Sequence, residues 1–363
     1  MAQNIQRGPG SIQTLPGILK QRDVRMPLLV CGATYQALNL EAVLHALSIH
    51  TVRFQGFSSN PRYEDILSGV SLFLNEGCDA IIAIGGGSAI DTAKCIRHFS
   101  DTSPDADMLR EPRRSSQVPL IAIPTTAGTG SESTRFAVIY RNNIKQTVTH
   151  DRLLPDDAIL DAALLRSLPV YPKTCALLDA LCQGIESWWA AASTEESILY
   201  AQRAVTGIIQ HMDRYLSGRF NPDTAQSILN AANDAGQAIH ITMTTAPHGL
   251  SYMLTTLYGL PHGHAVAILL PAVWRYMLAH PDDCTDRRGR DYLSCVFQNI
   301  ANAMNASDAL SAIDRFQSAL TQYRINPPRI QAGHLHEMAA SVSSTVVRHV
   351  PPCPGRYFAG LGY

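Results

Sequence analysis

The sequence lacks any continuous apolar run of about 18 residues, the length that a membrane-spanning helix requires, so we expect no membrane span. Its first residues also lack a basic flank, an apolar core and a small-residue cleavage site, which together would mark a secretory signal. The polar opening MAQNIQRGPGS therefore predicts a mature chain in the cytoplasm.

Charge is scarce and evenly divided between the two signs. Only 16% of the residues are charged, and the formal net charge is -1. A nucleic-acid-binding protein usually carries a basic excess, so we expect no nucleic-acid partner. Paired cysteines are missing as well, because the eight cysteines are scattered and form no C-x-x-C motif. This pattern predicts reduced, mostly buried thiols and no disulfide framework.

What the sequence does contain is a change of pattern near residue 165. A chain of 363 residues is long enough for two domains. Before residue 165, apolar runs typical of strands (26–32, 51–57, 79–84, 119–125) alternate with helical runs (40–50, 63–77, 88–99). This alternation predicts crossover units and a largely parallel sheet. From Lys173 onward the periodicity is helical, so we expect an α/β domain over 1–165 and an all-α domain over 166–363.

Three glycines and a serine follow the apolar run at 81–84. They are Gly85, Gly86, Gly87 and Ser88, and Asp91 falls in the first turn of the helix expected next. Glycine lets a backbone approach a ligand closely, and the first amides of a helix donate to anions. The stretch therefore suits a diphosphate. It matches neither G-x-G-x-x-G nor the P-loop, and a tight turn without a ligand is the alternative.

A second loop rich in hydroxyl groups follows the next expected strand. Thr125, Thr126 and Thr129 alternate there with Gly128 and Gly130. The carboxyl ends of successive parallel strands meet at the edge of the sheet where open α/β folds bind nucleotides. Both loops therefore favour a nucleotide site at one edge, with a solvated loop as the alternative.

Candidate metal ligands lie in the helical half. Three side chains in the stretch 178–189 share a helical face, and three histidines follow later. An aspartate and two histidines from different helices suit zinc or ferrous iron, whereas buried core histidines are the alternative reading. The residues are Asp179, Gln183, Glu186, His248, His262 and His264, with Tyr252 one turn after His248.

Four stretches in order, GGGSAIDTAK, PTTAGTGSES, DALCQGIES and the paired H…PHG, resemble the group III, iron-dependent alcohol dehydrogenase family. The resemblance runs from residue 8 to about residue 275. It implies a Rossmann-like nucleotide-binding domain over 1–165 and an all-helical domain over 166–363 that binds metal and substrate, as in the dehydroquinate synthase-like fold. It further implies NAD(P) and a metal in a cleft between the domains. A homodimer is compatible with the resemblance, although the sequence locates no interface.

The resemblance also assigns cofactor residues. The diphosphate loop corresponds to 85–88 with Asp91, and the second cofactor loop to Thr125, Thr126 and Thr129. Lys145 corresponds to a lysine beside the cofactor ribose. The family places an aspartate after the first strand where this chain has Gly32. Because an acid there repels a 2′-phosphate, we hypothesise that NADP(H) is accepted as well as, or in preference to, NAD(H).

For the metal, the resemblance assigns Asp179, His248 and His262 as ligands and favours iron over zinc. The family's usual fourth ligand, a histidine, is Gln183 here, which leaves three strong ligands and an open position. A further family histidine that relays protons is Tyr252 here, so Tyr252, His264 or water would complete proton transfer.

The implied reaction is reduction of a short-chain aldehyde to its alcohol, with the metal polarising the carbonyl oxygen. The stretches around 60–96, 187–197 and 257–271 are most similar to the phosphonoacetaldehyde reductase branch, which makes 2-hydroxyethylphosphonate. An anionic substrate needs a cation, and Arg135 is the candidate, with an exposed surface pair as the alternative. Against an anion, Met243 and Met253 stand where those relatives carry basic residues.

Other functions remain open on the sequence. A butanol- or glycerol-type dehydrogenase or a maleylacetate reductase would share the fold. Gln183 also leaves room for a metal-free oxidoreductase, and a non-catalytic nucleotide-binding descendant is the third alternative.

Overall fold

The computed structural model describes most of the chain. The described residues are 3–32, 49–101, 118–142 and 144–329, together with Tyr35, Leu38, Val43, Gln331 and His334. The helix expected over 40–50 lies almost wholly outside them.

The chain divides into two compact units. The first comprises Met1–Pro169 with Phe220–Asn233, and the second Val170–Arg219 with Asp234–Tyr363. The first change of unit falls four residues after the expected boundary at 165. The expectation that 166–363 forms one domain is wrong for 220–233, the start of helix α7 (Pro222–Thr242). The reason is a set of polar contacts: Gln226 accepts from Ala162 N at 3.1 Å and donates to Leu160 O at 3.0 Å.

Six parallel strands form the sheet of the first unit, in the order β1-β8-β5-β4-β2-β3. This confirms the expected parallel sheet. The sequence did not indicate the antiparallel hairpin β6–β7, which forms a separate two-stranded sheet. The strands are β1 (Asn4–Arg7), β2 (Pro27–Cys31), β3 (Val52–Phe54), β4 (Ala80–Gly85), β5 (Leu120–Pro124), β6 (Phe136–Arg141), β7 (Ile144–Thr149) and β8 (Asp157–Leu160).

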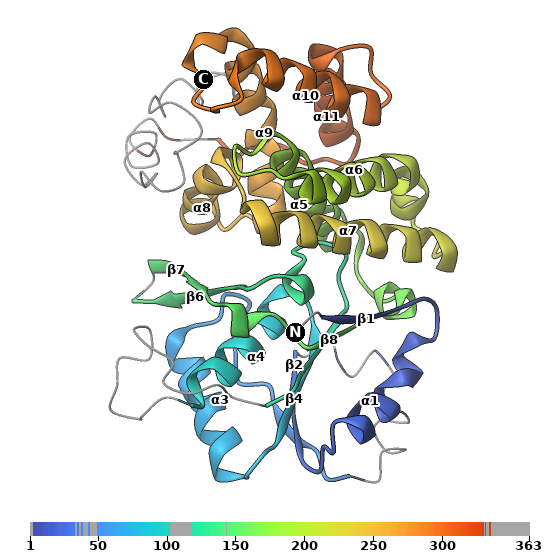
Figure 1. Ribbon diagram of the computed structural model, residues 1–363, viewed down its shortest axis with the longest axis vertical. Helices are drawn as coiled ribbons and strands as arrows, with labels where there is room; N and C mark the ends of the chain where they lie inside the picture. Colours follow the sequence, from blue (N-terminus) through green and yellow to red (C-terminus); the bar gives the residue numbers. More distant parts are fainter. Residues whose placement is uncertain are drawn as a thin grey trace. The chain divides into compact units, whose positions relative to one another are not determined.

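Helices cover both faces of this sheet, which explains why its central strands are apolar throughout. On one face, alternate strand residues such as Ile81 pack against α3 (Tyr63–Asn75) and α4 (Gly87–Phe99). On the other, residues such as Ile82 pack against α1 (Leu15–Gln21). Figure 1 shows α1 on one side of the sheet and α3 and α4 on the other.

The strand order also locates the point where the sheet changes direction. From β2 the chain first adds β3 at one edge and then returns to add β4 on the opposite side of β2. Open α/β sheets bind ligands at such a switch point, outside the carboxyl ends of the strands. The residues at these two ends are Gly32, directly after β2, and Gly85, the last residue of β4.

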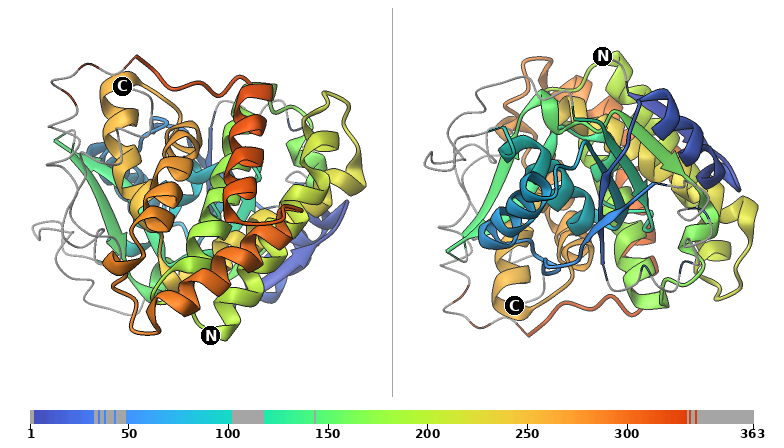
Figure 2. Two further views of the ribbon diagram at one scale, coloured as in Figure 1. Left: turned by 90° about the horizontal axis from the view of Figure 1, so that it is seen from above. Right: turned by 90° about the horizontal axis from the view of Figure 1, so that it is seen from below.

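The second unit is helical throughout its described part, as expected, and α5 packs against α6, α9 and α10 (Figure 2). Its helices are α5 (Val170–Trp189), α6 (Glu195–Leu216), the end of α7, α8 (Ala246–Tyr258), α9 (His262–Ala279), α10 (Gly289–Ala303) and α11 (Ala309–Gln322). Short 3-10 turns complete the two units: η1 (Ser11–Thr14), η3 (Ser131–Ser133), η4 (Asp151–Leu153), η5 (Ala162–Leu165) and η6 (Pro281–Asp283).

Two further expectations concern the thiols and the membrane. Every cysteine in the described part of the chain is free, and most are buried, as the scattered spacing predicted. Among the described helices, none combines the length and the apolar character that crossing a bilayer would demand.

A fully buried lysine on α4 ties the sheet domain's central helix to the hairpin. Lys94 Nζ donates to Thr134 Oγ1 at 3.1 Å and to Phe136 O at 2.7 Å, and it lies 3.9 Å from Asp91 Oδ1. Burial lowers the pKa of Lys94 to about 8, although the charges of Asp91 and Glu132 oppose this shift. A charged amine is therefore held in a site that disfavours its charge.

This arrangement predicts a pH-dependent stability. The ordinary pKa of 10.5 returns on unfolding, so between about pH 8 and 10.5 the unfolded chain binds a proton that the folded protein has lost. We expect the difference in the free energy of unfolding between the wild type and Lys94→Met not to change with pH below about pH 8. Across it the difference should rise by at most about 3 kcal/mol.

Urea denaturation over this pH range measures the difference. Lys20→Met, which alters an exposed lysine of α1, is the matched control and should follow the wild type. Parallel pH profiles for the wild type and Lys94→Met would contradict the burial argument.

Candidate active site

The two glycine- and hydroxyl-bearing loops lie against each other at the carboxyl edge of the sheet. Thr125 N donates to Gly85 O at 3.0 Å. A Cβ added to Gly86 would lie 3.3 Å from Thr126 Cγ2, and one added to Gly87 would lie 2.9 Å from Thr129 Oγ1. The glycines are therefore needed for the loops to approach this closely.

The start of α4 offers donors without a competing side chain. Its N-cap is Gly86, and no side chain caps the first turn. The Ser88 hydroxyl donates to Ser59 O, so its own contribution to an anion would come from the backbone amide. An uncapped helix start beside a glycine turn fits a diphosphate group. The predicted cofactor roles of 85–88 and of Thr125, Thr126 and Thr129 agree with this geometry and remain predictions.

Asp91 and Lys145 both belong to the first unit. Asp91 is nearly buried, and its Oδ2 accepts from Val138 N at 2.9 Å. Burial raises the pKa of Asp91, while the charges of Lys94 and, more weakly, Lys145 act to lower it. Lys145 lies on β7, and this weak electrostatic effect is its connection to Asp91. Both residues keep their predicted cofactor roles as proposals.

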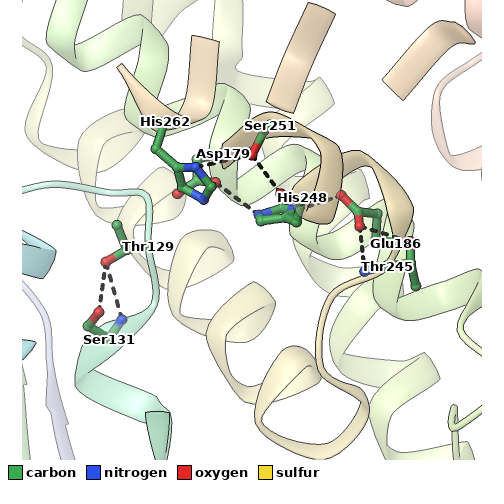
Figure 3. Close-up of polar contacts among 8 residues, drawn as sticks. All are labelled: Thr129, Ser131, Asp179, Glu186, Thr245, His248, Ser251 and His262. Carbon is green, nitrogen blue, oxygen red and sulfur yellow. Dashed lines mark hydrogen bonds and ion pairs between the residues drawn. The ribbon is translucent and has the colours of Figure 1, made fainter. Parts of the chain in front are cut away.

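Three predicted metal ligands converge in the second unit (Figure 3). Asp179 lies on α5, His248 on α8, and His262 is the first residue of α9. One donor atom from each lies within 4.8 Å of the others. Asp179 Oδ1 is 3.2 Å from His248 Nε2 and 3.9 Å from His262 Nε2. Asp179 and His248 are buried, whereas 34% of the His262 side chain is exposed, so the cluster is open on that side.

A buried carboxylate orients His248. Glu186 Oε1 lies 2.5 Å from His248 Nδ1, and its Oε2 accepts from Thr245 N at 2.7 Å and Thr245 Oγ1 at 2.8 Å. Since an ionised carboxylate only accepts, Nδ1 donates to Glu186, and Nε2 donates to Asp179 when the imidazole is charged. A bound metal would take the place of the proton on Nε2. Burial alone would lower the pKa of His248, but the Glu186 charge and the hydrogen bonds to Asp179 and Glu186 raise it to about 9.

His262 is oriented through a hydroxyl. Ser251 Oγ donates to His248 O at 2.7 Å and lies 3.4 Å from His262 Nδ1. With its own hydrogen used, the hydroxyl accepts from Nδ1–H, and His262 Nε2 is left to face Asp179. The Nε2 atoms of two imidazoles and a carboxylate oxygen thus meet at one point, where a proton on His248 or a bound cation balances the carboxylate charge. This donor set fits a divalent first-row metal.

Gly263 explains how α9 comes close enough to α5. A Cβ at this position would lie 2.0 Å from Cys175 O and 2.9 Å from Asp179 Cβ. Any larger residue would push the start of α9, and with it His262, away from Asp179. The glycine of the PHG motif is therefore a packing requirement of the cluster.

The remaining predicted residues of the second unit differ in their surroundings. Gln183 is buried on α5 one turn after Asp179, where its role as a fourth ligand stays a prediction. The Tyr252 ring stacks on His262, with ring centroids 6.0 Å apart. His264 has both nitrogens engaged, Nδ1 with the Tyr171 hydroxyl and Nε2 with Asn326 O, each at 2.8 Å. This arrangement favours Tyr252 over His264 for proton transfer.

Arg135 and Glu186 are the two residues whose surroundings the sequence described least well. Arg135 Nη1 pairs with Asp151 Oδ1 at 3.0 Å, and both side chains are well exposed, which is the surface pair named as the alternative to a substrate contact. Glu186 was noted only as a neighbour on the helical face of Asp179. Its spacing of seven residues from Asp179, two helical turns, was the available signal for its role.

Comparison with known proteins identifies the family. Residues 2–162 match the family model for iron-containing alcohol dehydrogenase, and residues 174–348 match the model for the carboxyl-terminal part of that family. The chain belongs to the iron-containing alcohol dehydrogenase family. The resemblance drawn from four motifs is thereby confirmed, and the members of the family are oxidoreductases.

Curated relatives are about a third identical to this chain over the aligned residues. Phosphonoacetaldehyde reductase of Streptomyces viridochromogenes is 36% identical over 261 residues, covering 68% of this chain and 66% of that protein. Probable alcohol dehydrogenase EutG of Escherichia coli is 31% identical, covering 74% of this chain and 70% of that protein. Lactaldehyde reductase of Escherichia coli is 29% identical, with 89% and 86% covered. The match thus spans just under two thirds of the reductase from Streptomyces.

Solved structures confirm the fold. An iron-containing alcohol dehydrogenase from Thermococcus thioreducens superposes with a TM-score of 0.87 at 22% identity, covering 99% of this chain and 98% of that chain. Sulfoacetaldehyde reductase from Bifidobacterium kashiwanohense, solved in complex with NAD+, gives 0.86 at 22% identity, covering 99% and 96%. The expected Rossmann-like unit followed by a helical unit is this fold.

The cluster predicts the metal content of a variant. His262→Ala removes one of three ligand atoms without adding bulk, and we expect it to retain about a tenth or less of the wild-type metal after anaerobic reconstitution with ferrous iron. Mass spectrometry of the desalted protein gives the metal content, and circular dichroism checks folding. His211→Ala, on α6 outside the cluster, is the control and should bind metal normally. Full metal content in His262→Ala would exclude His262 as a ligand.

Proposed function

We propose that the protein is an NAD(P)H-dependent reductase that converts a short-chain aldehyde to its alcohol with the help of a divalent metal. The observation that carries this proposal is the convergence of His248 Nε2, His262 Nε2 and Asp179 Oδ1 within 4.8 Å of one another. Family membership supports it, because the relatives of this chain are alcohol dehydrogenases and aldehyde reductases by name.

The first unit is proposed to hold the cofactor. The amides at the start of α4 would bind the diphosphate, and Thr125, Thr126 and Thr129 would contact the remainder of the dinucleotide. Gly32, at the end of β2, brings no carboxylate to the switch point. A 2′-phosphate would meet no repulsion from this residue, so we propose that NADPH is accepted along with NADH.

The second unit is proposed to hold the metal. Once bound, the cation supplies Lewis-acid stabilisation of negative charge on the carbonyl oxygen, and the reduced nicotinamide supplies the hydride. Asp179, His248 and His262 would hold the ion, with iron favoured over zinc by the family. Glu186 keeps the His248 proton on Nδ1, so that Nε2 stays available as a ligand. The Tyr252 hydroxyl, on the ring stacked against His262, would donate the proton that completes the alcohol.

For the substrate, we propose phosphonoacetaldehyde, giving 2-hydroxyethylphosphonate. The support is the 36% identity to a phosphonoacetaldehyde reductase. Arg135 would leave Asp151 to contact the phosphonate. Breaking the Arg135–Asp151 ion pair costs little, because an exposed ion pair stabilises by at most about 1 kcal/mol. A neutral aldehyde is the second candidate, favoured by that same ion pair and by the uncharged Met243, which is half exposed.

Anaerobic assays with NADPH and iron-reconstituted protein test the proposal. We expect kcat/KM for phosphonoacetaldehyde to exceed that for butanal by about tenfold or more, because an ionic contact adds about 1.4 kcal/mol or more. Chelation should abolish both activities. Turnover that survives chelation would contradict the metal assignment, and NADPH binding without turnover would point to a non-catalytic protein.

Arg135→Ala separates the two candidate substrates. We expect it to raise KM for phosphonoacetaldehyde about tenfold and to leave butanal kinetics unchanged. Asp151→Ala, which frees the guanidinium, is the matched control and should not weaken phosphonate binding. An unchanged KM for phosphonoacetaldehyde in Arg135→Ala would remove the basis for an anionic substrate.

A further inference from the structure

The helical unit contains a cavity that is separate from the metal cluster. It has a volume of about 150 Å³ and is bounded by α5, α6, α11 and the end of α10. Its inner wall is apolar and buried, formed by Leu178, Leu181, Met212, Met304 and Phe316. Neither histidine of the metal cluster nor Asp179 lines it. A space of about this size can hold a molecule of about six carbons.

The mouth of this cavity is polar. The exposed residues that line it are Asp213, Arg315, Ser318 and Gln322. Asp213 Oδ1 accepts a hydrogen bond from the Tyr323 hydroxyl, which holds the carboxylate in place. Arg315 makes no hydrogen bond or ion pair with another residue of the part of the chain that the structure describes. The mouth therefore presents one fixed acceptor and one guanidinium donor, with no net formal charge.

This combination selects among head groups. A hydroxyl both donates and accepts, so it can donate to Asp213 and accept from Arg315 at once. A carboxylate would be attracted by Arg315 and repelled by Asp213. An ammonium group would be attracted by Asp213 and repelled by Arg315. Because the two charges cancel, a neutral head group loses least on leaving water.

We propose that this cavity is a binding site for a straight-chain primary alcohol of about six carbons. The alkyl chain would fill the space between Leu181, Met304 and Phe316, and the hydroxyl would lie between Asp213 and Arg315. The ligand would contact Leu178, the residue that directly precedes the proposed metal ligand Asp179. The site goes beyond the proposed reaction, since it requires neither the cofactor nor the metal.

A chain-length series tests the cavity. Calorimetric titration of the iron-loaded protein, without nicotinamide so that no turnover occurs, compares butan-1-ol through decan-1-ol. We expect Kd to fall about fourfold for each added methylene, which corresponds to ~0.8 kcal/mol per buried CH₂. The fall should stop at about six carbons, when the cavity is full. Affinity that keeps rising to decan-1-ol would indicate partition onto a surface and would overturn the proposal.

Variants distinguish this cavity from the active site. Ala319→Leu fills the space from α11 and should weaken hexan-1-ol binding about tenfold or more, because the chain can no longer be buried. Ala303→Leu on α10, also half-buried but outside the cavity, is the matched control and should bind normally. His262→Ala should also bind hexan-1-ol normally. Binding lost in His262→Ala and kept in Ala319→Leu would place the alcohol at the metal cluster and overturn the proposal.

The head group is tested with two charged analogues. Hexanoate and hexylamine should each bind about tenfold more weakly than hexan-1-ol, because a charged group loses more hydration than a hydroxyl while its attraction to one mouth residue is offset by repulsion from the other. Arg315→Gln should weaken hexan-1-ol binding, whereas Arg287→Gln, at an exposed arginine outside the cavity, should not. Hexanoate that binds more tightly than hexan-1-ol, with the advantage lost in Arg315→Gln, would overturn the hydroxyl assignment.

Discussion

The hydrogen bond between the buried Glu186 carboxylate and His248 is the contact on which the helical unit's site depends. A carboxylate with no solvent exposure requires donors, and here they are His248 Nδ1, Thr245 N and Thr245 Oγ1. Satisfying Glu186 therefore fixes the start of α8 against α5 and commits His248 Nδ1 to donating, which leaves Nε2 as the nitrogen that a metal could use. The same contact that stabilises the helix packing prepares Nε2 as a ligand.

A second constraint brings the third ligand into place. Gly263 allows the start of α9 to approach Cys175 O on α5 more closely than any other residue could, and His262 follows from that approach. The metal cluster thus combines residues of three helices, and it depends on the buried Glu186–His248 hydrogen bond and on the absence of a side chain at Gly263. In the first unit, glycines play the same part where 86 and 87 meet Thr126 and Thr129. Both sites therefore depend on a glycine that lets one segment of backbone pack closely against another.

The sequence located the elements and residues of these two regions because each has a local signature, and their binding roles stay predictions. Strand periodicity located β4 and β5, the glycine turn marked the start of α4, and the spacing of Asp179, His248 and His262 matched a family pattern. What it could not predict depends on partners distant in the chain. The ties of Gln226 to residues 160 and 162, which place the start of α7 in the first unit, leave no periodic pattern. The bonds of His264 to Tyr171 and Asn326, and of Arg135 to Asp151, are equally invisible locally.

The most direct measurement is the ferrous iron affinity of Glu186→Gln against that of the wild type, by anaerobic titration. An amide cannot accept from His248 and Thr245 together as the carboxylate does, so we expect an affinity lower by about 10- to 100-fold in a protein that still folds. An unchanged affinity would contradict the claim that this buried hydrogen bond prepares His248 as a ligand.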